Sequence, residues 1–279
     1  MDILQTIIMG IVQGLSEFLP ISSSAHLVFS SNFYKIIKGA EIIQNTNQEV
    51  FLDIMLHIGT LIAVLIYFRK DIKEIIFGFF SGLKSGNWEN KDFKMSIYII
   101  WGTLMTVCVA YPLFRVAQWL VFKPEYTAIL LIFTGAILLS SEHISKKLNS
   151  GKNISLKNSI LIGIAQGFAS LPGFSRSGLT IATGLFSGVS RTESARYSFL
   201  LSIPIILGAS VAYPLLTIDF NEVITYNWTA ITIGTIVSGI VGYLCIKYFL
   251  KFLSKFSLNI FGYYCIIMGV FASIFFFIK

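Results

Sequence analysis

Six long apolar runs constrain what this chain can fold into more than any other feature of its sequence. They cover residues 52–68, 95–113, 125–141, 196–216, 228–246 and 259–278, and each is long enough for a helix that crosses the hydrocarbon core of a bilayer. A chain of 279 residues, 55% of them hydrophobic and 13% charged, cannot cover these runs with a water-facing shell. We therefore expect an all-α integral membrane protein with six full spans.

Two further segments, 3–33 and 157–190, are apolar at both ends but interrupted at the centre. The interruptions read LPISSSAH at residues 19–26 and LPGFSRSG at residues 171–178. Such a polar, proline-containing break is tolerated at membrane depth only where protein or a water-filled cavity meets the freed backbone groups. Each segment is therefore predicted to be a re-entrant hairpin, in which a half-helix, a turn and a second half-helix return to the side they entered.

The distribution of lysine and arginine tests this layout, because short cytoplasmic loops carry an excess of both. With six alternating spans and two re-entrant hairpins, one side holds fifteen of the 21 Lys and Arg residues, in the loops 69–94, 142–157, 189–196 and 247–256. The other side, made of loops 34–50, 114–124 and 217–227 and of Lys279, holds five, and Arg176 in the second hairpin is the remaining one. We therefore expect the rich side to be cytoplasmic and both termini to lie outside.

The same layout predicts an inverted repeat within a single membrane domain. Residues 1–150 would form the first repeat and residues 151–279 the second, each with one hairpin and three spans. Two stretches echo each other directly, MGIVQGLSEFLPISSS at residues 9–24 and IGIAQGFASLPGFSRS at residues 162–177. In membrane proteins built in this way, broken half-helices commonly meet near the midplane and form the site.

The two breaks have the composition of an anion site. The second half-helix of each hairpin should begin at serines that can cap free backbone N–H groups, Ser22–Ser24 in one and Ser175–Ser177 in the other. Each start is a positive dipole end, so two converging starts favour an anion such as phosphate, and the guanidinium fork of Arg176 suits its oxygens. The residues predicted to bind this anion are Gln13, Ser22, Ser24, Ser175, Ser177 and Thr180.

Glu17 and Arg176 would be ionised at bilayer depth, which costs roughly 2.5 to 3.5 kcal/mol each on insertion scales. Either they form an ion pair that only holds the hairpins together, or they belong to a site. His26 favours the site, because Ser22 and Ser23 lie four and three residues before it and can share its helix face. A hydroxyl, an imidazole, a carboxylate and an arginine around a phosphate-sized space are the parts of a phosphoryl-transfer site.

Two motifs carry a resemblance to a known family. The pattern Gln-x-x-x-Glu-Phe-x-Pro-x-Ser-Ser-x-x-His runs from Gln13 to His26, and Pro-Gly-x-Ser-Arg-Ser-x-x-Thr runs from Pro172 to Thr180. Both resemble motifs of undecaprenyl-diphosphate phosphatase of the bacitracin-resistance type, and the similarity covers essentially the whole chain. The resemblance implies a bacterial plasma-membrane enzyme that removes the terminal phosphate of undecaprenyl diphosphate and so recycles the lipid carrier of cell-wall synthesis.

The resemblance also implies site residues and a cofactor. The family's functional positions fall on Glu17, Ser23, His26, Ser175, Arg176 and Thr180. A divalent cation, Mg²⁺ or Ca²⁺, is implied as well, with Glu17 as its candidate ligand. Gln13 stands where some relatives carry a second Glu, which weakens an argument for two carboxylates on one metal ion.

Several alternatives stay open at this level. Ser23 activated by His26 is the preferred nucleophile, and direct attack by His26 or by water competes with it. Glu17 could hold the cation or act as a general base. The architecture also fits a transporter, or a flippase of the lipid carrier, with an anion site between two broken helices. A homo-oligomer is possible, and the net charge of +7 follows from topology without nucleic acid as a partner.

Polar residues outside the two breaks have simpler interpretations. His57, in the first span, is expected to donate a hydrogen bond in helix packing. Glu142 is expected to face solvent at a helix end. Arg191 and Arg196 are expected to pair locally with Glu193 in a short loop.

Overall fold

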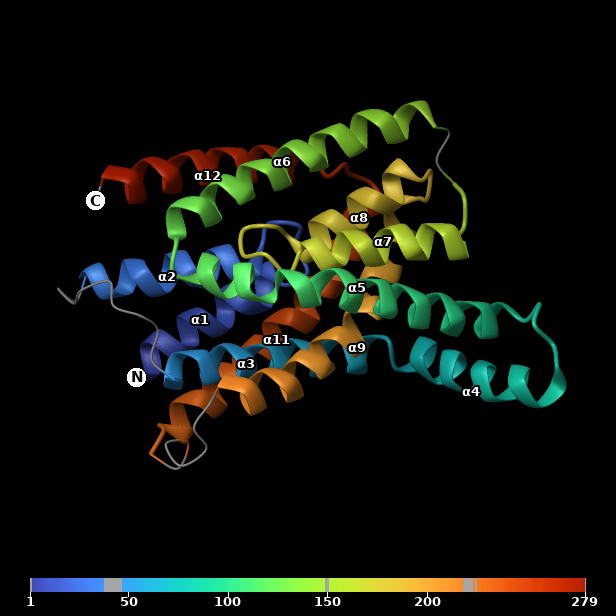
Figure 1. The fold of residues 1–279 in the computed structure, drawn as a ribbon, viewed down its shortest axis with the longest axis horizontal. Helices are drawn as coiled ribbons and strands as arrows, with labels where there is room; N and C mark the ends of the chain where they lie inside the picture. Colours follow the sequence, from blue (N-terminus) through green and yellow to red (C-terminus); the bar gives the residue numbers. More distant parts are fainter. Residues whose placement is uncertain (1, 38–46, 149–150, 218–222, 224, 279) are drawn as a thin grey trace.

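A computed structural model describes residues 2–37, 47–148, 151–217, 223 and 225–278. Within these ranges the chain is all-helical, with eleven helices numbered α1 to α9, α11 and α12 (Figure 1). Most of them run along one common direction, as in a membrane bundle (Figure 1). Lys279 and parts of the loops 34–50, 142–157 and 217–227, on which the predicted topology depends, lie outside the described residues.

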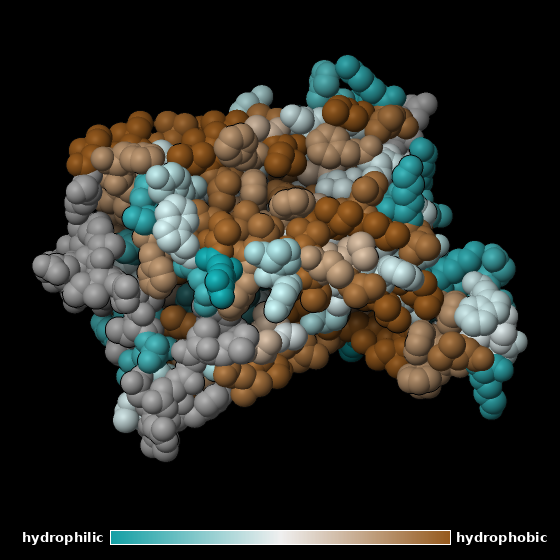
Figure 2. Space-filling model, viewed as in Figure 1, coloured by the Kyte–Doolittle hydropathy of each residue, from teal (hydrophilic) through white to brown (hydrophobic). Residues whose placement is uncertain are grey.

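Six of the described helices are long and apolar enough to cross a membrane. They are α3 (Asn47–Tyr67), α5 (Lys91–Val121), α6 (Pro124–Lys147), α9 (Arg191–Thr217), α11 (Trp228–Leu253) and α12 (Asn259–Ile278). Each overlaps one of the predicted apolar runs, so the six predicted spans correspond to six candidate membrane spans. Apolar side chains also dominate the middle of the face in Figure 2, as expected for a surface in contact with lipid. The chain is therefore a multi-pass membrane protein.

Both predicted hairpins consist of two helices with a break between them. The first is α1 (Ile3–Ser16) followed by α2 (Ser23–Ile37), and the second is α7 (Leu156–Phe168) followed by α8 (Arg176–Phe186). The breaks fall at the two polar, proline-containing centres of the sequence, where proline cannot continue a helix. The helix–turn–helix form of both segments is thus as predicted.

The loop predicted at 69–94 contains a helix that the sequence analysis missed, α4 (Arg69–Ser85). It ends at Gly86, whose φ of 67° is the left-handed conformation favoured by glycine. Gly78 and Gly82 let α4 lie directly against Asp92 and Phe93 at the start of α5. Figure 1 shows the pair of helices projecting from one end of the bundle.

Glycines bring the first helix of each hairpin into close contact with a span from the other half of the chain. A Cβ at Gly14 of α1 would stand 2.8 Å from the carbonyl oxygen of Ser238 in α11. A Cβ at Gly163 of α7 would stand 2.3 Å from the carbonyl oxygen of Gly102 in α5. Small residues that allow such close backbone approach are typical of helix interfaces in membranes.

A buried ion pair joins α6 to the start of α9. The carboxylate of Glu142 accepts hydrogen bonds from Nε and Nη2 of Arg191, at 2.7 and 2.6 Å, and from the backbone N–H of Leu258. Because Glu142 is only 1% exposed, the expectation that it faces solvent is wrong. Arg196 contacts Glu193 as expected but also pairs with Asp71 of α4.

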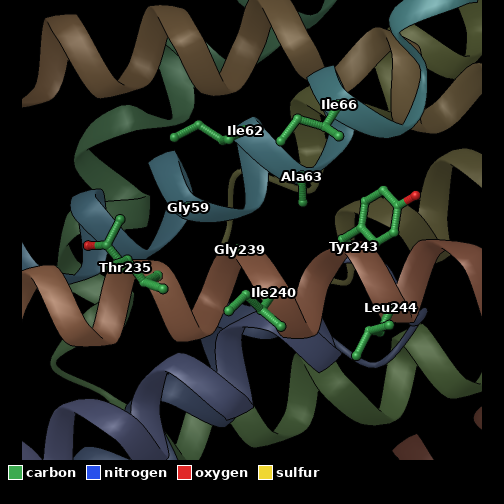
Figure 3. Close-up of a pocket in the computed structure, with 10 residues that line it drawn as sticks. Gly59, Ile62, Ala63, Ile66, Thr235, Gly239, Ile240, Tyr243 and Leu244 are labelled. Atoms are coloured by element: carbon green, nitrogen blue, oxygen red, sulfur yellow. The ribbon is translucent and has the colours of Figure 1, made fainter.

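An apolar groove of about 430 Å³ runs between α3 and α11 (Figure 3). The close backbone approach of Gly59 and Gly239 lies within it, and Ile62, Ile66 and Ile240 are exposed along it. None of the predicted site residues lines this groove. The candidate site must therefore be built from the hairpins.

Candidate active site

The two polar breaks meet, although 150 or more residues separate their contacting side chains. Nη2 of Arg176, the first residue of α8, lies 2.6 Å from Oε1 of Glu17 at the end of α1. The hydroxyl of Ser177 donates to the carbonyl oxygen of Leu19, in the other turn, at 3.0 Å. The expected convergence of the two hairpins is therefore present.

Serine caps begin the second helix of each hairpin, as the sequence predicted. The hydroxyl of Ser22 accepts from the backbone N–H of Ala25 at 3.3 Å, and that of Ser175 accepts from the N–H of Gly178 at 3.0 Å. Ser22 has a φ of 70°, a left-handed conformation that side-chain-bearing residues rarely adopt. Such strained residues concentrate at functional sites.

The Glu17 carboxylate contacts three other polar side chains of the site. Its Oε2 accepts from the hydroxyl of Ser23 at 2.8 Å and from Nε2 of Gln13 at 3.0 Å, while Oε1 faces Arg176. The Glu17 side chain is 5% exposed. A carboxylate in hydrogen-bond contact with a hydroxyl can receive its proton, so the geometry would allow Glu17 to act as a base toward Ser23.

His26 does not contact Ser23, contrary to the expected pairing of the two. Its Nδ1 lies 2.8 Å from the carbonyl oxygen of Ser22, and its Nε2 lies 2.7 Å from the hydroxyl of Tyr264. A carbonyl oxygen can only accept, so Nδ1 donates and Nε2 accepts from Tyr264. Both nitrogens of the imidazole thus have partners, in its own helix and in α12. The Ser23 hydroxyl hydrogen-bonds to Glu17 and not to His26.

Two buried polar atoms of the site have no hydrogen-bond partner among the described residues. They are Nη1 of Arg176 and Oε1 of Gln13. Buried polar atoms are normally satisfied, so an unpaired donor and an unpaired acceptor in one site point to a ligand. Nη2 of Arg176 therefore pairs with Glu17, and Nη1 is left as a donor that an anion could accept from.

The remaining predicted binding residues surround these atoms. Ser24 and Ser22 place their hydroxyl oxygens 3.2 Å apart. Ser175, Ser177 and Thr180 are buried, and Thr180 lies 2.6 Å from the hydroxyl of Ser198 in α9. These three hydroxyls order the start of α8, and their contact with a ligand stays a prediction.

His57 belongs to the site, although it was expected to serve helix packing. Its Nε2 lies 3.6 Å from Oε2 of Glu17. Asp53 and His57 stand four residues apart in an apolar span. This polar helix face was the sequence pattern that could have indicated a functional role for His57. Tyr264 gives no comparable signal, because nothing local distinguishes it from the other aromatic residues of α12.

A divalent cation is compatible with this site if the ligand supplies part of its coordination. The described residues contain no group of three His, Cys, Asp or Glu side chains that could hold a metal ion. Oxygen donors are nevertheless present, because the unpaired Oε1 of Gln13 lies in the same cluster as the Glu17 carboxylate. Mg²⁺ commonly takes one or two carboxylates and completes its shell with phosphate oxygens and water.

Fold and site together define a multi-pass helical membrane protein in which a buried Glu, a partly buried Arg and a partly buried Ser cluster where two broken helices meet. The chain belongs to the family described as Bacitracin resistance protein BacA, which matches residues 6–271.

Its relatives match over nearly their full length. It is 40% identical to "Undecaprenyl-diphosphatase" of Methanobrevibacter smithii, over 97% of this chain and 96% of the relative. It is 38% identical to the protein of the same name from Halothermothrix orenii, with the same coverage. It is also 38% identical to "Undecaprenyl-diphosphatase 2" of Halalkalibacterium halodurans, over 99% of this chain and 97% of the relative.

Proposed function

We propose that this protein is an undecaprenyl-diphosphatase, which hydrolyses undecaprenyl diphosphate to undecaprenyl phosphate and inorganic phosphate. Family membership and the names of its relatives support the substrate. The reaction returns the lipid carrier to its monophosphate form and confers resistance to bacitracin. Because the relatives come from both bacteria and archaea, a bacterial plasma membrane stays a prediction.

One observation carries the chemistry: Arg176 has a buried donor, Nη1, with no partner among the described residues, while its Nη2 holds the base beside the Ser23 hydroxyl. A guanidinium in this position can neutralise the charge that develops on phosphate oxygens during transfer. An ion pair that served packing alone would give no reason to bury an unpaired Nη1.

In the proposed reaction, Ser23 attacks the terminal phosphorus and its proton passes to Oε2 of Glu17. A bond forms between Oγ and phosphorus as the bond from phosphorus to the bridging oxygen breaks, which releases undecaprenyl phosphate. Water then attacks the phosphoserine, inorganic phosphate leaves, and Glu17 returns the proton to Ser23. A bound Mg²⁺ or Ca²⁺, held by Glu17 and Gln13, would neutralise charge on the diphosphate.

Helix packing supports the proposed inverted repeat, with residues 1–150 and 151–279 as its two halves. The first hairpin helix of each half packs on the second full span of the other half, α1 on α11 and α7 on α5. The third spans, α6 and α12, pack on each other. Both hairpins would then be re-entrant, with both termini outside and the basic loops in the cytoplasm.

The test is phosphate release from undecaprenyl diphosphate by the purified protein in detergent. A phosphatase needs no membrane gradient, whereas a transporter or flippase alone releases nothing. Arg176→Lys should lower turnover by about 10² to 10³, because lysine keeps the charge but loses the fork. Arg115→Lys, at an exposed position of α5, is the matched control and should leave turnover unchanged.

A charge swap separates this proposal from simple ion pairing. Glu17→Arg combined with Arg176→Glu keeps an ion pair between the hairpins but puts a carboxylate where phosphate needs the guanidinium. The swapped protein should fold and be inactive. Turnover near that of the unaltered protein, in the swap or in Arg176→Lys, would show that Arg176 has only a structural role.

A further inference from the structure

His57 reaches both the Glu17 carboxylate and a cavity beside the site. The cavity, of about 90 Å³, lies between α2 and α3, and Ser24, Ser31 and Asp53 also line it. The side chain of Glu17 is 5% exposed and that of His57 is 33% exposed. His57 therefore stands between the buried carboxylate and the open space.

The orientation of the His57 ring is fixed by its own helix. Nδ1 lies 2.7 Å from the carbonyl oxygen of Asp53, one turn earlier in α3. Since a carbonyl oxygen only accepts, Nδ1 carries a proton, and Nε2 is the nitrogen turned toward Glu17. Nε2 lies 3.6 Å from Oε2 of Glu17, which is a polar contact longer than a hydrogen bond.

The oxygen that His57 approaches is the one that receives the Ser23 hydroxyl. Arg176 holds Oε1 from α8, while His57 approaches Oε2 from α3. Arg176 and His57 thus approach the two carboxylate oxygens from different helices, in the orientation in which Oε2 accepts from Ser23. We propose that His57 is a positioning residue for Glu17, an inference that rests on the proposed phosphatase function.

The cavity explains why such positioning is needed. Ser31, which is 5% exposed, lines it, and its buried hydroxyl has no hydrogen-bond partner among the described residues. The cavity is large enough for a water molecule, and Ser24, Ser31, Asp53 and His57 in its lining can hydrogen-bond to one. Without His57, that water would reach Oε2 and compete with Ser23 for the carboxylate.

The test compares two substitutions of His57. His57→Leu should lower kcat by about 10- to 100-fold, because a small misplacement of a reacting group has effects of this size, and should leave KM within about twofold. His57→Gln should recover most of the loss, because its amide Nε2 can donate to Glu17. His143→Leu, at an exposed position of α6, is the matched control and should behave as the unaltered protein.

A double-mutant cycle tests whether His57 acts through Glu17. In Glu17→Asp the shorter carboxylate no longer reaches His57, so adding His57→Leu should cost little further turnover. The same loss in both backgrounds, unchanged kcat in His57→Leu, or failure of His57→Gln to recover activity would each overturn the positioning role. Should His57→Leu not fold, His57→Asn, whose amide is too short to reach Glu17, takes its place.

The two proposals fail in different ways. If the unaltered protein releases no phosphate from undecaprenyl diphosphate, the proposed function fails. If it does release phosphate and His57→Leu turns over as fast, the phosphatase stands and only the positioning role of His57 fails.

Discussion

The hydroxyl of Tyr264 lies 2.7 Å from Nε2 of His26, and the two rings are stacked with 12° between their planes. With Nδ1 held by the carbonyl oxygen of Ser22, both nitrogens of this imidazole are engaged. The contact ties α2, which begins at the site, to α12 near the end of the chain. His26 is thus held in one tautomer, as an acceptor toward Tyr264.

Tyr264→Phe removes this hydrogen bond and keeps the ring. We expect kcat to fall about 2- to 10-fold, the range of one net hydrogen bond, because His26 loses the partner that fixes its orientation. Steady-state phosphate release measures the effect. Tyr263→Phe removes a neighbouring hydroxyl that is exposed and serves as control; equal losses in both variants would refute the role of the His26 contact.

Ser23→Ala tests the proposed nucleophile. The variant should lose turnover on the order of 10³-fold or more, as loss of a nucleophile does in enzymes that form covalent intermediates. Rapid quenching of the unaltered protein with substrate labelled at the terminal phosphate should leave label on the protein, and Ser23→Ala should carry none.

Ser30→Ala, further along the same helix, is the control for Ser23→Ala and should retain both turnover and label. If Ser23→Ala turns over normally, or if the label persists in it, the nucleophile is His26 or water.

The spans and the breaks could be predicted because each depends on local sequence. An apolar run long enough for the bilayer predicts a helix wherever it occurs, and Pro20 and Pro172 with the serines that follow predict where helices stop and restart. The helix α4 was missed because its lysines were used to assign the loop a side of the membrane. Its stability depends on Gly78 and Gly82, which pack on α5.

The pairings within the site depend on long-range contacts that a single sequence does not carry. His26 hydrogen-bonds to Tyr264, which lies 238 residues away in the sequence, and Arg191 pairs with Glu142, which lies 49 residues away. Ser23 and Glu17 are close in sequence, but their spacing of six residues crosses the break and matches no helical repeat. Helical spacing instead suggested His26 as the partner of Ser23, but the turn between α1 and α2 brings the Ser23 hydroxyl to Glu17.

Gly163→Ala should destabilise the fold. Its Cβ would stand 2.3 Å from the carbonyl oxygen of Gly102, so α7 must move away from α5, which costs about 1 to 3 kcal/mol. Thermal unfolding in detergent measures the effect. Gly208→Ala in α9 is the control, because no atom lies within 4 Å of its added Cβ, and it should be neutral or stabilising.

Arg191→Ala should destabilise the protein more strongly. It would leave the Glu142 carboxylate buried without its charged partner, and breaking a buried pair in this way costs about 3 to 5 kcal/mol. Adding Glu142→Gln removes the stranded charge and should recover part of the loss in unfolding temperature. An Arg191→Ala variant as stable as the unaltered protein would mean that the pair contributes nothing.

The orientation of the chain can be tested with single cysteines, because the basic loops predict opposite sides for two described positions. Cys245 and Cys265 are buried, so a Cys108→Ser background removes the one exposed thiol. In intact cells an impermeant maleimide should label Phe122→Cys, at the end of α5, and should not label Ser85→Cys, at the end of α4.

Both of these positions are exposed, so accessibility in the folded protein does not separate them; only the membrane does. Permeabilised cells are the control, in which both cysteines should react. Labelling of Ser85→Cys in intact cells, with Phe122→Cys protected, would invert the topology. It would place the fifteen Lys and Arg residues of the basic loops outside, against the bias that sets the orientation of membrane proteins.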